Sequence, residues 1–127
     1  MADIPDSHPR KASLMSRLRM VEASKRGLLA ESAMIAHGRG EAFDYLLGER
    51  TSDSASLAIR EAAARLLVAE SPVISMNGNS TVLAGSEAIM IASILGCPVE
   101  VNIYYRTSER MESLIGELES LRDRLGR

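Results

Sequence analysis

The chain has few of the residues that mark several common protein classes. Its 127 residues include one cysteine, no tryptophan, one phenylalanine and three tyrosines. The lone Cys97 cannot form a disulfide within the chain, and residues 1–30 lack the basic start and apolar stretch of a signal peptide. Aromatic rings are too few for a surface that stacks single-stranded nucleic acid. We therefore expect a protein of the reducing cytoplasm.

An excess of one charge and long apolar runs are also lacking. Fifteen Lys and Arg stand against seventeen Asp and Glu, a formal net charge of -2, which argues against a nucleic-acid-binding domain. The longest uncharged stretches, 71–86 and 88–99, are interrupted by polar residues, glycine or proline. Both fall short of the roughly 20 apolar residues that span a bilayer. The sequence predicts neither a nucleic-acid partner nor a membrane partner.

The familiar catalytic and metal-binding motifs are missing. There is no phosphate-binding loop, no glycine-rich dinucleotide motif and no nucleophile elbow. The two histidines, His8 and His37, are far apart, and one cysteine gives no zinc spacing, so no metal ligands are predicted. The composition still allows a Ser/His/Asp hydrolase.

The length fits one domain, 1–127, whose first part, residues 1–70, has the apolar spacing of helices. The spacing predicts a long amphipathic helix over 9–29 and short helices over 31–36 and 41–47, interrupted at residues 37–40. It also predicts a well-buried helix over 55–69. The interruption would leave Arg39, bracketed by Gly38 and Gly40, in a flexible segment between two helices.

The second part, residues 71–127, alternates strands and helices. It predicts a strand over 73–76 ending in a tight turn at 77–79, a helix over 86–95 closed by Gly96, and a strand over 99–104. A final helix carries an apolar stripe of Met111, Leu114, Leu118, Leu121 and Leu125. This β-α-β-α order is typical of an α/β fold with a parallel sheet and right-handed crossovers. Two strands are too few to cover these helices, so we expect further strands, missed here or supplied by another chain.

Three segments could bind an anion or carry chemistry. Asn77 and Asn79 follow the first predicted strand, although Asn-Gly is also an ordinary turn pair. Arg106 follows the second strand, next to a helix N-terminus that favours phosphate, although Thr107 or Ser108 could simply cap that helix. Arg39 is the third candidate. The first helix also has a cationic face of Arg10, Lys11, Arg17, Arg19, Lys25 and Arg26, a pattern that is more often a solvated surface.

A family resemblance rests on several of these segments. They are residues 3–5 and 8–10, Ser13 and Leu14 with Arg17, Ile35 and Ala36 followed by the block HGRGEAFDYL at 37–46, PVIS at 72–75, NGN at 77–79, VN at 101–102 and YRT at 105–107. Together they resemble the N-terminal half of archaeal phosphopantothenate synthetase, also called 4-phosphopantoate:β-alanine ligase. Members of that family are longer, and their second half carries further nucleotide contacts.

The resemblance implies a Rossmann-like parallel sheet with flanking helices, of which this chain would be an incomplete half. It also implies an ATP-dependent ligase of coenzyme A biosynthesis, working as a homodimer with ATP and Mg²⁺. That ligase joins 4-phosphopantoate to β-alanine through an acyl-adenylate. Arg17 and Arg39 match ATP-contacting positions of the family, and Arg39 is the catalytic candidate because it would offset charge as diphosphate leaves.

Other roles at the expected site are hypotheses. Strand-end geometry suggests Asn77, Asn79 and Arg106 for the carboxylate and phosphate of 4-phosphopantoate. Glu41 could pair with an arginine or with the β-alanine ammonium, and a structural role is the simpler expectation. The alternative function is a non-catalytic nucleotide-binding or assembly module that needs a partner chain.

Overall fold

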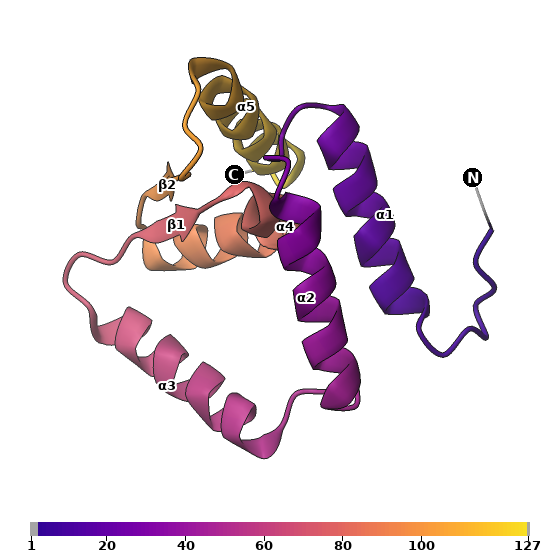
Figure 1. Cartoon of the computed structure of the whole chain (residues 1–127). Coiled ribbons are helices and arrows are strands. Elements are labelled where there is room, and N and C mark those ends of the chain that lie inside the picture. Colours follow the sequence, from indigo (N-terminus) through magenta and orange to yellow (C-terminus); the bar gives the residue numbers. More distant parts are fainter. Residues whose placement is uncertain (1–2, 127) are drawn as a thin grey trace.

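The computed structural model describes residues 3–126, which form five helices and two short strands (Figure 1). The expected α/β class is confirmed, as is the β-α-β-α order of the second part. In chain order the elements are α1 (Lys11–Lys25), α2 (Ala33–Leu46), α3 (Asp53–Val68), β1 (Ile74–Met76), α4 (Gly78–Leu95), β2 (Val99–Val101) and α5 (Ser108–Arg124).

The two strands pair in parallel, with Ile74 opposite Val99 and Met76 opposite Val101. These four apolar residues pack against α4 and α5, while the alternate residues Ser75 and Glu100 are exposed. The second strand was expected to continue to residue 104 but ends at Val101. The reason is that β1 has no further residues to pair with, since the chain enters α4 directly after Met76.

Helix α4 is the centre of the described fold and contacts α1, α2, α5 and both strands. Its start corrects an expectation, because residues 77–79 form no separate turn. Asn77 is the N-cap: its Oδ1 accepts the Ser80 N–H and the Ser80 hydroxyl oxygen accepts the Asn77 N–H, each over 2.9 Å. The helix runs on to Leu95 with a kink at Ala84, and Gly96 closes it in the left-handed conformation as expected.

The length and composition of α4 would also allow it to cross a membrane. The core helix of a soluble protein can pass the same test, and α4 packs against other elements along its length. Six of its residues are buried: Gly78, Thr81, Gly85, Ala88, Ile89 and Ala92.

The apolar stripe of α5 lies on one side of that helix, as expected. Leu114 and Leu118 are buried, and α4 packs along the same side. This row is therefore covered within the described residues. Gly85 allows the close approach, since a Cβ there would lie 2.6 Å from Leu121 Cδ1.

Helix α1 ends at Lys25, earlier than the expected residue 29. The chain turns at Gly27, whose φ is +75°, and the Leu28 N–H donates back to the Ala23 carbonyl over 3.1 Å. This turn sends Leu28 and Leu29 into a core with Met20, Ala23, Ala33, Ile103 and Leu114.

The expected interruption at residues 37–40 is wrong, because α2 is one continuous helix. Neither Gly38 nor Gly40 has a positive φ. A glycine costs a helix only about 1 kcal/mol relative to alanine, which the packing of α2 against α1 and α4 can offset. Arg39 therefore lies within a helix and not in a flexible segment.

Helix α3 forms as predicted but is not buried, which corrects a further expectation. None of its residues is buried, and Leu57, Ile59, Leu67 and Val68 are between 61% and 81% exposed. In Figure 1 it stands apart from the other helices, joined to α2 and β1 by loops. The described residues offer no surface to cover its leucine-rich and alanine-rich face.

Candidate functional site

Two neighbouring pockets lie along α2, and Ala36 and Asn79 line both of them. The larger, of about 930 Å³, is bounded by α1, α2 and the start of α3. The smaller, of about 190 Å³, lies where the two strands end. Ligands of α/β folds bind at this edge of the sheet, so the pair of pockets is the candidate site.

The smaller pocket contains two of the residues predicted from sequence, Asn77 and Asn79, with Tyr104 and Tyr105 opposite. The Asn77 side-chain oxygen is used as the cap of α4. The Asn79 side-chain nitrogen donates to the Ala33 carbonyl over 3.1 Å, which ties α4 to α2. As the first residues of a helix have N–H groups without intrahelical acceptors, this end of α4 favours an anion.

Arg106, the third residue predicted for this region, is exposed and does not line the pocket. Arg110 lines it instead. Its Nη1 donates to the Tyr105 carbonyl over 2.6 Å and its Nη2 to the Leu28 carbonyl over 3.4 Å. Its Nε is buried without a partner. The sequence held a signal that was overlooked, since Arg110 precedes Leu114 by four residues and so shares its inward face.

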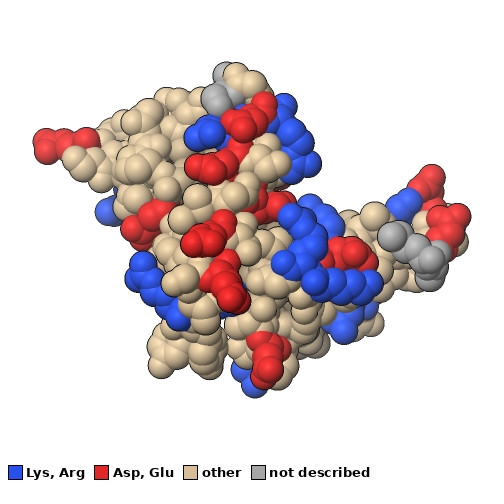
Figure 2. All heavy atoms as spheres, turned by 90° about the horizontal axis from the view of Figure 1, so that it is seen from above, with Lys and Arg blue, Asp and Glu red and all other residues tan. Residues whose placement is uncertain are grey.

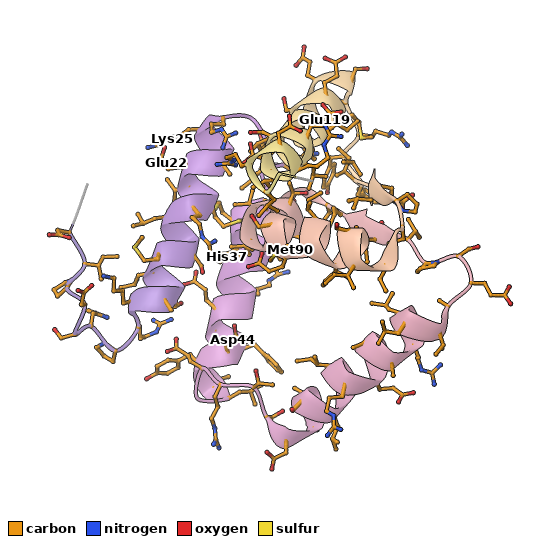
Figure 3. All side chains as sticks on the ribbon, turned by 180° about the vertical axis from the view of Figure 1, so that it is seen from behind. Glu22, Lys25, His37, Asp44, Met90 and Glu119 are labelled. Carbon is orange, nitrogen blue, oxygen red and sulfur yellow. The ribbon has the colours of Figure 1, made fainter. Side chains whose placement is uncertain are left out.

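The larger pocket contains His37 and Glu41, one helical turn apart on α2. Glu41 Oε1 lies 3.3 Å from Arg17 Nη1 and 3.4 Å from His37 Nε2. Glu41 Oε2 accepts a hydrogen bond from the Ser13 hydroxyl over 3.3 Å. Of the two partners suggested for Glu41, the structure shows the arginine, Arg17. Figure 3 shows His37 on the part of α2 next to α4, with Asp44 nearer the far end.

Arg10, at the start of α1, links this cluster to the loop after α2. Its Nε donates to the Glu49 carboxylate over 2.7 Å, and its Nη2 donates to Ser13 over 3.2 Å. Its guanidinium also lies 5.3 Å from the centre of the Tyr45 ring. The hydrogen bond that Arg10 donates to the Glu49 carboxylate raises the pKa of Arg10. Arg10 therefore keeps its charge and orders the mouth of the larger pocket.

The cationic face of the first helix is largely neutralised. Carboxylates pair with five of its six members, as Arg10–Glu49, Lys11–Asp6, Arg17–Glu41, Lys25–Glu22 and Arg26–Glu117. From above, acidic side chains form a band with basic side chains on either side (Figure 2). The face in that view has no extended basic surface.

The two arginines expected to contact ATP do not share a pocket in residues 3–126. Arg17 points to Glu41, at the edge of the larger pocket. Arg39 is exposed and makes no ion pair or side-chain hydrogen bond within the described residues. It lies two residues from both His37 and Glu41, about 200° around the axis, and so on the opposite side of α2.

The sequence of this chain is similar to those of one described family and of several curated proteins. Residues 54–124 match the profile of the family described as phosphopantothenate/pantothenate synthetase. A 4-phosphopantoate–β-alanine ligase of Thermococcus onnurineus is 48% identical over 118 residues, which are 93% of this chain and 45% of that protein. Ligases of the same name from Thermococcus kodakarensis and Methanosarcina mazei are 49% and 46% identical, over 93% and 94% of this chain and 45% and 47% of theirs.

The chain spans less than half the length of these curated relatives. The family profile, however, covers more than half of the chain and includes β1, α4, β2 and α5. The similarity to the ligases runs through both pockets. The chain therefore belongs to the phosphopantothenate/pantothenate synthetase family.

Proposed function

We propose that this chain supplies the ATP-facing and 4-phosphopantoate-facing part of a ligase that condenses 4-phosphopantoate with β-alanine in coenzyme A biosynthesis. The observation that carries this proposal is the 46–49% identity to ligases of that name over more than nine-tenths of the chain. The two adjoining pockets along α2 support it, because the reaction must bring an activated acid next to an amine.

The proposed reaction has two steps. In the first, a carboxylate oxygen of 4-phosphopantoate attacks the α-phosphorus of ATP, and the bond to diphosphate breaks. In the second, the β-alanine nitrogen attacks the acyl carbon, the bond to the AMP oxygen breaks, and an amide forms. A positive charge near the leaving diphosphate would lower the first barrier.

We keep Arg17 and Arg39 as the triphosphate candidates because of the family resemblance, not because of a shared pocket, and we assign Arg39 to the charge that develops as diphosphate leaves. Both guanidinium groups are accessible: the Arg17 side chain is 48% exposed, and Arg39 is exposed on α2. We assign Asn77 and Asn79, with the start of α4, to the carboxylate and phosphate of 4-phosphopantoate. Arg106 belongs to the same proposal as a side chain that would close over this end of the sheet. It follows Tyr104 and Tyr105, which line the smaller pocket.

Mg²⁺ would enter with ATP. Within residues 3–126 no three His, Cys, Asp or Glu side chains converge, so the proposed magnesium ion is held chiefly by phosphate oxygens, as is common for this ion. A homodimer in the cytoplasm, with neither nucleic acid nor membrane as a partner, completes the proposal. The balanced charge of -2 and the single cysteine support this part.

A non-catalytic assembly module is the second candidate. The observation that favours it is α3, which presents four large apolar side chains to solvent and has no buried residue. A helix of this kind needs a partner surface. The chain would then bind nucleotide, or another protein, without completing the reaction by itself.

The deciding experiment is AMP release from ATP by the purified chain, with 4-phosphopantoate and β-alanine each omitted in turn. Release that requires both substrates would support the ligase proposal and show that these residues suffice for the reaction. ATP binding without any release would favour the assembly module, and a chain indifferent to ATP would contradict the ligase proposal.

Arg39→Ala tests the assigned arginine. Loss of a charge that acts on the departing diphosphate should lower turnover by about 10²–10³-fold, with an unchanged melting temperature because Arg39 is exposed. Arg65→Ala is the matched control, because Arg65 also lies within a helix, α3, and its side chain is 79% exposed. Equal turnover of the two variants would remove Arg39 from the site.

A further inference from the structure

His37 has a buried ring nitrogen, Nε2, that makes no hydrogen bond in the fold. Its side chain is only 8% exposed, and its Nε2 has no hydrogen-bond partner. Leaving such an atom unpaired costs about 1–3 kcal/mol. The neighbouring Glu41 oxygen, 3.4 Å away, does not complete a hydrogen bond to it. A buried ring nitrogen without a hydrogen bond, on a residue that lines a pocket, indicates a ligand atom that would pair with it.

The Glu41 carboxylate beside it is also loosely held. Its contacts to Arg17, Ser13 and His37 measure 3.3, 3.3 and 3.4 Å, whereas charge-assisted hydrogen bonds normally lie near 2.7–2.9 Å. The Arg10–Glu49 pair in the same pocket shows the tighter value, 2.7 Å. Glu41 therefore has room for a closer donor.

The chemistry of the two side chains selects that donor. Unprotonated imidazole nitrogen and carboxylate oxygen are both acceptors, so the pair suits a group with several N–H bonds. A phosphate would be repelled by Glu41. A divalent cation would need more ligands, and no third His, Cys, Asp or Glu joins the pair within the described residues. The other charged side chains that line this pocket are Arg10, Arg19, Asp44, Glu49 and Arg50.

We propose that His37 Nε2 and the Glu41 carboxylate bind the ammonium group of the amine substrate, and that His37 accepts its proton. In the ligase this substrate is β-alanine, so the inference rests on the proposed function. Asn79 lines both pockets and so places this pair next to the expected 4-phosphopantoate pocket.

The proton balance is as follows. The ammonium donates to Glu41 and to Nε2, and one proton moves to Nε2. The freed lone pair of the amine attacks the acyl carbon, and the bond to the AMP oxygen breaks with its electrons leaving on AMP. The second amine proton passes to water as the amide forms. His37 releases its proton before the next turnover.

Binding can be tested directly on the whole chain, because it has only two histidines. With ¹⁵N-labelled histidine, β-alanine should shift the Nε2 resonance of His37 saturably and leave that of the exposed His8 unchanged. Propionate, which has the carboxylate but no amine, should cause no shift, and Glu41→Gln should weaken β-alanine binding about tenfold or more. An unmoved His37 signal, or an equal response to propionate, would overturn the proposal.

The proton transfer is tested by His37→Gln and His37→Ala. Glutamine retains an oxygen acceptor but cannot take a proton, so the KM for β-alanine should persist while kcat falls about 10²–10⁴-fold. The alanine variant should lose both the affinity for β-alanine and the proton transfer, so its KM should rise and its kcat should fall. Exchange of labelled diphosphate into ATP, dependent on 4-phosphopantoate, should survive in both variants because it precedes the amine step.

These outcomes separate the two proposals. No diphosphate exchange by the unmodified chain would contradict the ligase function, while the resonance titration still tests the amine site. Normal exchange together with unchanged amide formation in His37→Gln would remove the proton-accepting role and leave the ligase function intact.

Discussion

Leu114→Ala and Leu57→Ala form a matched pair that tests how the helices are covered. Both replace a leucine in a helix with alanine, so the change in helix propensity is the same. Leu114 on α5 is 0% exposed in the core between α1, α2 and α4, whereas Leu57 on α3 is 66% exposed. Any difference between the variants therefore reports the burial of the side chain.

The expected magnitudes differ widely. Truncating a buried leucine costs about 2–5 kcal/mol, through lost burial and the cavity left behind. At about 4 °C per kcal/mol for a domain of this size, a loss near 3 kcal/mol lowers Tm by roughly 12 °C. An exposed leucine should cost no more than about 0.5 kcal/mol, or roughly 2 °C.

The assay is thermal and urea unfolding followed by far-UV circular dichroism, with both variants and the parent chain at two protein concentrations. A Leu57→Ala loss as large as that of Leu114→Ala would refute the reasoning that α3 is uncovered. A loss at Leu57 that grows with protein concentration would point to a second copy as the cover. A negligible loss at Leu114 would refute the assigned core.

Three further changes test local features by the same unfolding measurements. Asn77→Ala removes the side-chain cap of α4 and should cost about 1 kcal/mol; an unchanged midpoint would show that the cap contributes nothing. Gly38→Ala should stabilise the chain by about 0.5–1 kcal/mol, because an added Cβ meets no atom within 4 Å. Gly78→Ala should instead destabilise it by about 1–3 kcal/mol, since its Cβ would lie 3.1 Å from the Leu28 carbonyl oxygen. The same sign for both glycines would contradict the packing described at α4.

The second half of the fold follows closely from the sequence. Alternating apolar residues in short β-branched runs, followed by apolar residues at helical spacing, predict β1, β2 and the buried side of α5. The reason is that these patterns depend on local geometry. The left-handed position of Gly96 is local in the same way. Strand ends are less predictable, because β2 ends where its partner does.

The sequence-based predictions are wrong where contacts between residues distant in sequence determine the structure. Gly38 and Gly40 weaken a helix locally, but packing against α1 and α4 supports α2. For α3 the pattern indicates a buried face, and no local feature reveals that residues 3–126 leave it open. At the candidate site, Asn77 and Asn79 were predicted because they follow a strand, and both line the smaller pocket. His37 was missed because its buried nitrogen is evident only once neighbouring elements pack around it, and Arg110 because its place on the inward face of α5 was overlooked.

The shortness of the sheet has a consequence for the order of folding. Two parallel strands of three residues each cannot persist alone, and the eighteen residues of α4 separate them along the chain. Their pairing therefore requires that α4 has already folded back and that α5 covers it. The strands should therefore pair last, after the helices have packed together, and the helices should not need the sheet in order to pack.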